Sequence, residues 1–157
     1  MNNNLPIGYK LNKGSLKDRS LLGKLMYLTY QELFPHQNDF SHLTATIDQY
    51  FSTNTPLWLI QREEKVGTID GTVACLWMGS AIDQVNGERY AHIFVLFVLP
   101  EHRRQGIGTT LIRTAETWAK ARGDRQIGLQ VFNNNQPALN LYHHLGFKTQ
   151  SIAMIKP

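Results

Sequence analysis

The sequence predicts an α/β (α+β) fold in a single domain, residues 1–157, with a mixed central β-sheet of about six to seven strands flanked by about four helices. The chain has 157 residues, of which 42% are hydrophobic, enough for one buried core. Strand and helix patterns alternate along it, as they do when helices cover a sheet. Residues 90–99 are nearly all apolar in their second half, which predicts a strand buried on both faces in the middle of the sheet.

The N-terminal half carries the patterns of three strands and two helices. Apolar residues at helical spacing predict a long helix that Ser15 can cap, with Asp18 favouring its N-terminus and Pro35 stopping it. A weaker helical pattern follows, and alternating or apolar runs predict the strands. The predicted elements are a strand at 7–11, helices at 15–33 and 41–51, and strands at 57–61 and 73–78.

The C-terminal half alternates strands and helices after a turn that contains Asn86-Gly87. Gly123 ends the first predicted helix, and Pro137 lies in the first turn of the second. The predicted elements are a strand at 90–99, a helix at 106–122, a strand at 127–132, a helix at 136–145 and a last strand at 147–156.

Composition limits the functions that need to be considered. Sixteen Lys and Arg against twelve Asp and Glu give a net charge of +4, which permits an anionic partner without requiring nucleic acid. Cys75 is the single cysteine, so an internal disulfide and a cysteine-based zinc cluster are excluded. The longest apolar run, 93–100, is too short to span a membrane, and residues 1–6 lack a leader pattern. We therefore expect a cytoplasmic protein without a metal site.

The segment from Val98 to Gly108 combines a buried strand end, a basic loop and two glycines before a helix. A helix start exposes N–H groups and carries a partial positive charge, so it can bind an anion. Glycines at 106 and 108 keep side chains away from those N–H groups, and Arg103 and Arg104 add positive charge. The segment predicts a phosphate or pyrophosphate site.

Two commoner phosphate loops do not fit this segment. A dinucleotide fingerprint needs a third glycine or an alanine where this chain has Leu111. It also needs an acidic residue at the end of the next strand, but the predicted strand at 127–132 is followed by Asn133. The P-loop pattern of glycines followed by Lys and Ser or Thr is absent from the sequence.

A second informative segment runs from Asn134 to Phe147. Asn135 can cap the short helix or turn its amide toward a ligand, and Gly146 permits the chain to reverse into the last strand. Taken alone, Tyr142 on this helix is compatible with an ordinary packing role.

Together the two segments resemble the GNAT family of acyl-CoA-dependent N-acetyltransferases. The family loop L-x-V-x-P-x-x-[QR]-x-x-G-x-[GA] is matched by Leu96, Val98, Pro100, Arg103, Gly106 and Gly108. The second family motif, N-x-x-A-x-x-L-Y-x-x-x-G-[FY], is matched by Asn135, Ala138, Leu141, Tyr142, Gly146 and Phe147. Both motifs occur in the expected order, and the resemblance covers essentially the whole chain.

The resemblance implies a site for acetyl-CoA as acyl donor. The backbone of residues 96–98 would pair with the pantetheine arm, the N–H groups of residues 104–109 would hold the pyrophosphate, and Tyr142 would donate a proton to the departing thiolate. A tyrosine with a pKa of about 10 is protonated at pH 7, so it can act as that acid. The implied cofactor-binding residues are Leu96, Phe97, Val98, Arg103, Arg104, Gln105, Gly106, Ile107, Gly108, Thr109 and Asn135.

The general base is less clearly indicated. Relatives that acetylate ribosomal proteins carry a glutamate where this chain has Gln130, which cannot accept a proton, so that substrate class is disfavoured. Histone-acetyltransferase relatives place a glutamate at the position of His92, and an imidazole with a pKa of about 6.5 suits a base at neutral pH. Tyr90 and a water relay remain alternatives. The resemblance also implies that Glu32 and His36, near the end of the first long helix, would line the acceptor pocket.

The favoured function is therefore acetyl transfer to a primary amine of a small molecule or peptide. The resemblance leaves a homodimer open and implies neither a nucleic acid nor a membrane as partner. One alternative is a non-catalytic acyl-CoA-binding regulator, because an acidic base is missing. Another is a basic nucleic-acid-binding module, which is disfavoured because the cations cluster at one helix start rather than along a face.

Overall fold

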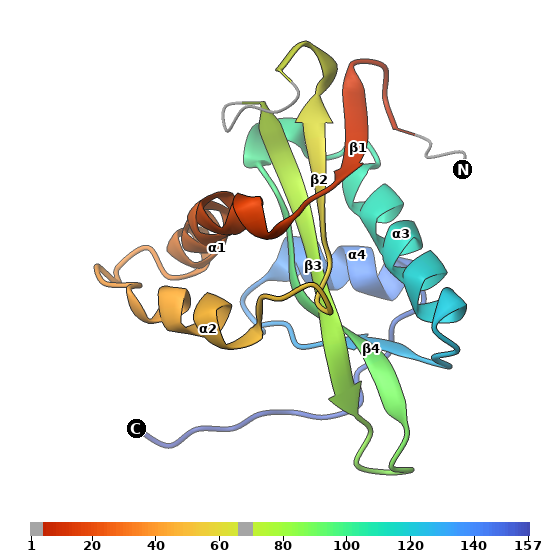
Figure 1. The fold of residues 1–157 in the computed structure, drawn as a ribbon. Coiled ribbons are helices and arrows are strands. Elements are labelled where there is room, and N and C mark those ends of the chain that lie inside the picture. The colour runs from red at the N-terminus through yellow and green to blue at the C-terminus, as the bar shows by residue number, and fades with distance from the viewer. Residues whose placement is uncertain (1–4, 66–70) are drawn as a thin grey trace.

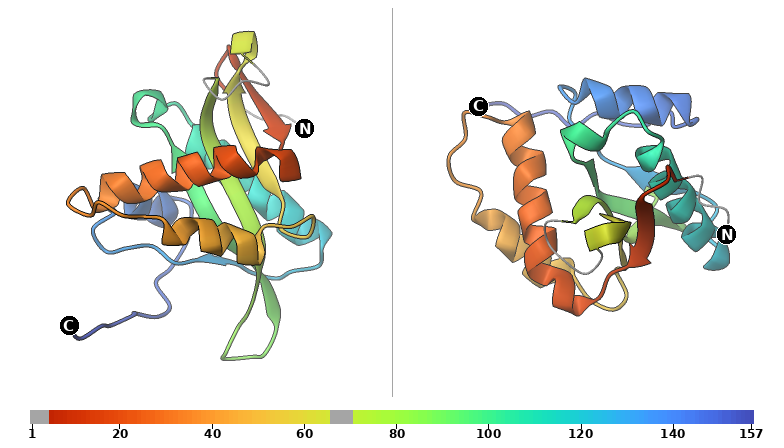
Figure 2. Two further views of the ribbon diagram at one scale, coloured as in Figure 1. Left: turned by 60° about the vertical axis from the view of Figure 1, so that its left-hand side comes forward. Right: turned by 90° about the horizontal axis from the view of Figure 1, so that it is seen from above.

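The computed structural model describes residues 5–65 and 71–157 and shows one five-stranded sheet with helices on both faces (Figures 1 and 2). The sheet order is β1-β2-β3-β4-β5, antiparallel throughout except for the parallel pair β4–β5. The elements are β1 (Tyr9–Lys13), η1 (Leu16–Asp18), α1 (Arg19–Leu33), α2 (His42–Tyr50), β2 (Leu57–Arg62), η2 (Glu63–Lys65), β3 (Thr72–Ile82), β4 (Arg89–Val98), η3 (Pro100–His102), α3 (Ile107–Ala121), β5 (Ile127–Leu129) and α4 (Gln136–His144).

The helical segment begins where Ser15 predicts, with a 3₁₀ turn that precedes α1. The Ser15 hydroxyl accepts a hydrogen bond from the N–H of Lys17 at 3.2 Å, and the Asp18 carboxylate accepts one from the N–H of Ser15 at 2.8 Å. This reciprocal cap opens the short turn η1, which runs directly into α1. The helix ends at Leu33, before Pro35, so the predicted N-terminal helix is confirmed.

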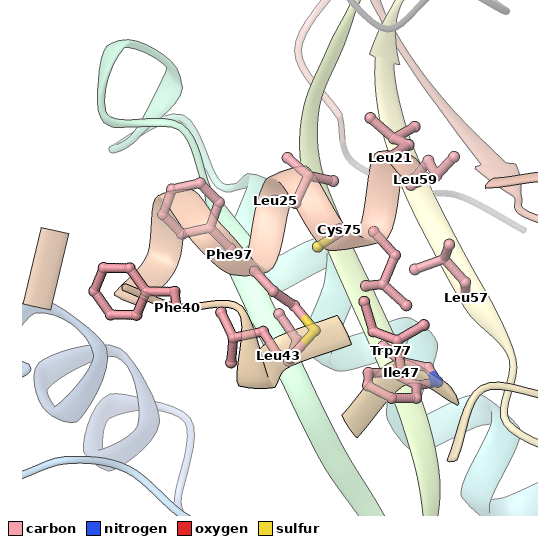
Figure 3. Packing of buried hydrophobic residues seen from close by; sticks show 13 residues of the cluster. Leu21, Leu25, Phe40, Leu43, Ile47, Leu57, Leu59, Cys75, Trp77 and Phe97 are labelled. Carbon is pink, nitrogen blue, oxygen red and sulfur yellow. The ribbon is translucent and has the colours of Figure 1, made fainter. Parts of the chain in front are cut away.

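One face of the sheet is covered by α1 and α2. Leu21 and Leu25 from α1 and Leu43 and Ile47 from α2 are buried in one hydrophobic cluster with Trp77 of β3 (Figure 3). The indole N–H of Trp77 donates to the carbonyl of Thr55 at 3.1 Å, which satisfies the polar atom of this buried ring. Helices α1 and α2 are thereby fixed across the middle of the sheet (Figure 2).

The opposite face is covered by α3 and α4. Leu111, Ile112 and Ala115 of α3 are fully buried in a second cluster that also contains Ile93 of β4 and Tyr142 of α4. Ile107, at the start of α3, belongs to this second cluster, so the predicted phosphate site at that helix start lies toward the face away from α1 and α2.

Near its middle, strand β4 bulges against β3 and ends its pairing with β5. The β3–β4 register shifts so that Trp77 pairs with Val95 and Met78 pairs with Ile93, which leaves Phe94 as a bulge. The parallel pairing with β5 ends at Ile93 and Leu129. Beyond Ile93, the β5-side edge of β4 therefore has no strand partner among the described residues.

Three details differ from the sequence prediction. The sheet has five strands rather than six to seven, and β5 stops at Leu129 because the chain then turns away from β4. The predicted last strand at 147–156 is wrong: residues 148–157 are exposed and have no regular secondary structure. A strand needs a partner, and these residues pair with no described strand.

The sequence predicts neither a membrane-spanning helix nor a leader segment. No helix in the described residues is long and apolar enough to span a membrane. The prediction that residues 1–6 lack a leader pattern falls partly on residues 1–4, which lie outside the described residues.

Candidate functional site

The loop between β4 and α3 presents a row of unpaired backbone N–H groups. β4 ends at Val98 and α3 begins at Ile107, and the chain between them adopts positive φ at Arg104 (63°) and Gly106 (82°). Within residues 5–65 and 71–157, the N–H groups from Arg104 through Thr109 meet no acceptor, and α3 has no side-chain cap. A helix N-terminus with free donors and a positive dipole end is suited to an anion.

Gly106 and Gly108 are each required in this loop, but for different structural reasons. A Cβ at Gly106 would meet no atom within 4 Å, so its requirement is the positive φ and the open approach to the N–H groups. A Cβ at Gly108 would lie 2.9 Å from Cδ2 of Leu141, so the absence of a side chain lets α3 pack closely on α4. Gly108 therefore brings the start of α3 next to the helix that carries Tyr142.

Arg103 is held by the protein itself. Its Nε donates to the carbonyl of Val98 at 2.8 Å, and its NH2 group lies 2.9 and 2.8 Å from the two carboxylate oxygens of Glu32. The guanidinium also lies 5.6 Å from the ring centroid of Phe97. These contacts tie the end of α1 to the loop. The neighbouring Arg104 is exposed and has no ion pair within the described ranges, so it is the freer cation for an anionic ligand.

We expect the Arg103–Glu32 pair to show measurable coupling in stability. A double-mutant cycle with Arg103→Gln and Glu32→Gln, followed by urea unfolding, should give a coupling free energy of about 0.5–1 kcal/mol that shrinks in high salt. The surface pair Arg125–Glu88, at 3.5 Å and with its arginine 82% exposed, is the matched control and should show almost none. Equal coupling in the two pairs would contradict the proposed tie between α1 and the loop.

Tyr142 lies on α4, and its side chain is buried. The ring packs against Phe147 at a centroid distance of 5.5 Å, and burial raises the pKa of Tyr142 to about 12. The phenol is therefore protonated at neutral pH. Its hydroxyl hydrogen-bonds to no residue in the described ranges, so the proton is not committed to another group.

Asn135 begins α4 as its N-cap. Its side-chain oxygen accepts a hydrogen bond from the N–H of Ala138 at 3.3 Å, which confirms the capping role. The side-chain NH2 group of Asn135 forms no hydrogen bond within the described residues, so it can still meet a ligand.

His92 lies on β4, on the sheet face that carries α1 and α2. Its ring is 5.3 Å from the ring of Phe94 and 6.1 Å from that of Tyr90, and its buried Nδ1 atom has no hydrogen-bond partner among the described residues. Burial lowers the pKa of His92 below its usual value, so the imidazole is neutral at pH 7. A neutral imidazole with a free nitrogen can accept a proton.

The chain matches the sequence profile described as "Acetyltransferase (GNAT) family" over residues 24–147. The protein belongs to the GNAT family. The predicted family is thereby confirmed, and the mixed sheet flanked by four helices agrees with solved GNAT structures.

Several curated GNAT relatives are similar to this chain over part of its length. An uncharacterized N-acetyltransferase of Methanocaldococcus jannaschii is 36% identical over 60% of this chain and 44% of its own length. Human N-acetyltransferase 8B is 37% identical over 58% of this chain and 37% of its own length. The chain thus spans less than half of these two relatives. An N-alpha-acetyltransferase of Sulfurisphaera tokodaii is 28% identical over 89% of this chain and 80% of its own length.

Solved structures agree with the GNAT fold. A putative acetyl transferase from Pyrococcus furiosus has a TM-score of 0.76 at 23% identity, covering 95% of this chain and 99% of its own. Aminoglycoside N-acetyltransferase AAC(6')-Iy, solved in complex with CoA, has a TM-score of 0.69 at 16% identity, covering 95% of this chain and 93% of its own. At these identities the likeness concerns the fold.

Some of the predicted site residues lie near the start of α3 and on α4, and others lie away from them. Gly108 at the start of α3 adjoins Leu141, the neighbour of Tyr142 in the second half of α4, and Asn135 caps the start of the same helix, whereas His92 lies on the opposite face of β4. Glu32, predicted for the acceptor pocket, is bound to Arg103, and His36 is exposed between α1 and α2. Among the described residues, no group of three His, Cys, Asp or Glu side chains could hold a metal ion.

One aromatic contact was not predicted. Phe132, just beyond β5, stacks edge-on against Phe34 of α1 at 5.0 Å. Only the turn of the chain away from β4 after Leu129 creates this contact, and no local sequence pattern encodes that turn.

Proposed function

We propose that this GNAT protein transfers the acetyl group of acetyl-CoA to a primary amine of a small molecule or peptide by direct attack. The observation that carries the proposal is the row of free N–H groups from Arg104 through Thr109, placed at the end of a strand whose β5-side edge is unpaired. An anionic ligand with an extended, hydrogen-bonding arm fits this combination, and acetyl-CoA has both parts.

Each part of the donor would meet a different group of the chain. The pyrophosphate would accept from the N–H groups of the loop, with Arg103 and Arg104 supplying positive charge. The amides of the pantetheine arm would pair with the free edge of β4 at residues 96–98, as an added strand does. The NH2 group of Asn135 would bind the same arm from the start of α4.

The reaction needs one proton removed and one supplied. The amine nitrogen attacks the thioester carbon, the C–N bond forms, and the C–S bond breaks with its electron pair on sulfur. Tyr142 would give its proton to this sulfur. The burial that keeps Tyr142 protonated would also disfavour a bare thiolate beside it, which promotes the transfer.

His92 would accept the proton of the amine, directly or through water. Because burial lowers the pKa of His92, the base is already neutral at pH 7, and the acid limb of kcat/KM should lie below pH 6.5. In a His92→Gln variant this limb should disappear and turnover should fall by about 10²-fold. An unchanged pH profile in the variant would assign the base to Tyr90 or to a water relay.

Thiol release in an amine panel tests the proposed function directly. The protein is incubated with acetyl-CoA and a series of small primary amines and peptides, and free CoA thiol is measured against a no-acceptor control. Acceptor-dependent release supports the transferase. Saturable acetyl-CoA binding without release for any amine would favour a non-catalytic acyl-CoA-binding regulator instead.

A further inference from the structure

We infer that the acceptor is a primary amine carried next to an aromatic or large apolar group, and not a polycationic amine. The inference rests on the proposed function and concerns the sheet face that carries α1 and α2. It follows from the position of two aromatic groups and from the partners of the nearby carboxylates.

The acceptor side of the site is set by the point where β4 and β5 part. The start of α3 and α4 lie on one face of the sheet, opposite α1 and α2 (Figures 1 and 2). An amine that reaches a thioester between the two strands would therefore come from the α1 and α2 face. On that face, the parting at Ile93 and Leu129 adjoins His92 and Phe94, whose rings contact each other. The residues around this point therefore meet the body of the acceptor.

The first aromatic group bridges α1 and the segment after β5. Phe132 lies 5.0 Å from Phe34 and 6.0 Å from Tyr30, measured between ring centroids. The Asn134 side-chain NH2 group donates to the carbonyl of Leu33 at 3.0 Å, which holds the segment against the end of α1. Phe132 remains 46% exposed, so the group offers ring surface as well as packing.

The second aromatic group follows β4. Tyr90, His92 and Phe94 form successive ring contacts, and Tyr50 at the end of α2 lies 5.6 Å from Phe94. Tyr50 is 45% exposed. Exposed ring surface is thus present at Phe132, which follows β5, and at Tyr50, which contacts Phe94 of β4.

The carboxylates on the elements that frame this face already have partners. On α1, α2 and the segment between them, Glu32 is paired with Arg103 and Asp48 with Arg19, and the Asp39 carboxylate accepts a hydrogen bond from the N–H of Ser41 at 2.8 Å.

These pairings disfavour an acceptor that carries several positive charges. An additional ammonium group would compete with Arg103 for Glu32 or with Arg19 for Asp48, and only Asp39 on these elements is a carboxylate without a paired cation among the described residues. An aromatic or apolar body, in contrast, can cover exposed ring surface. The shared chemistry of the acceptor is thus one amine beside an apolar group, found both in small arylalkylamines and at the N-terminus of a peptide that begins with an aromatic residue.

The test compares amines of both kinds at saturating acetyl-CoA by thiol release. We expect 2-phenylethylamine or the tripeptide Phe-Gly-Gly to exceed both kanamycin and spermidine in kcat/KM by tenfold or more. The faster of the first two identifies the source of the amine as a small molecule or a peptide. A preference for kanamycin or spermidine would overturn the inference.

Variants at Phe132 test whether its ring contacts the acceptor. Phe132→Ala should raise KM for the preferred aromatic amine about tenfold and leave the Kd of acetyl-CoA unchanged, since one apolar contact is worth about 10- to 200-fold in discrimination. Phe132→Asp should shift preference toward spermidine. The control Ile7→Ala removes a fully exposed apolar side chain and should change neither value. An unchanged KM in Phe132→Ala would overturn the inference.

Binding without turnover separates this inference from the proposed function. If no amine releases thiol, saturation-transfer NMR measures binding of 2-phenylethylamine to the protein–CoA complex. Binding that is lost in Phe132→Ala would retain the acceptor site and overturn only the transferase activity. Absence of binding would overturn the acceptor site as well.

Discussion

Replacing Tyr142 by phenylalanine should lower kcat by about 10²–10⁴-fold while acetyl-CoA still binds with unchanged affinity. The change removes only the hydroxyl, whose proton is the one that the departing thiolate would take. Burial raises the pKa of Tyr142 to about 12, so the wild-type group carries this proton throughout the neutral range. Steady-state thiol release and calorimetry of acetyl-CoA measure the two effects separately.

The folded structure should tolerate this change. The Tyr142 ring packs against Phe147, and its hydroxyl has no hydrogen-bond partner within the described residues, so Phe preserves the contacts that are present. The thermal unfolding midpoint is therefore expected to stay within a few degrees of wild type. Unaffected turnover would show that another group or water supplies the proton.

Replacing Gly106 by aspartate should weaken acetyl-CoA binding by more than about 100-fold. The new carboxylate would stand among the N–H groups from Arg104 through Thr109, where it repels the pyrophosphate and competes with it for the same donors. A Cβ at Gly106 meets no atom within 4 Å, so the fold has room for the side chain. Calorimetric titration with acetyl-CoA measures the loss.

Gly106→Asn is the matched control. Asparagine has the size of aspartate and a similar tolerance of the positive φ at this position, but it carries no charge. Its loss of affinity should be much smaller than that of Gly106→Asp. Equal losses in the two variants would attribute the effect to backbone strain, and intact binding in both would place the pyrophosphate elsewhere.

The sequence predicted best what is determined locally. The cap at Ser15 and Asp18, the strand at 90–99, the glycine-bearing start of α3 and the cap at Asn135 each depend on residues close together in the chain. Hydrophobic spacing also placed α1 and α2 correctly, since one side of each helix must be buried. These elements suffice to position the loop and to indicate the family.

Contacts between distant segments could not be predicted in the same way. The Glu32–Arg103 pair joins α1 to a loop far along the chain, and the bulge at Phe94 appears only when β4 is aligned with β3. The segment at 147–156 has an apolar pattern that suits a strand, but strand formation requires a partner, and the sheet ends at β5. Local patterns report the preference of a segment, not the presence of its partner.

The position of Cys75 has a practical consequence for enzymology. Cys75 is the only cysteine of the chain, it is fully buried in the middle of β3, and burial raises its pKa to about 12. Disulfide reagents react with accessible thiolates, so we expect the buried thiol of Cys75 not to react with them in the folded protein. We therefore expect such a reagent to record liberated CoA with little contribution from the native protein, and to titrate one thiol per molecule in denaturant.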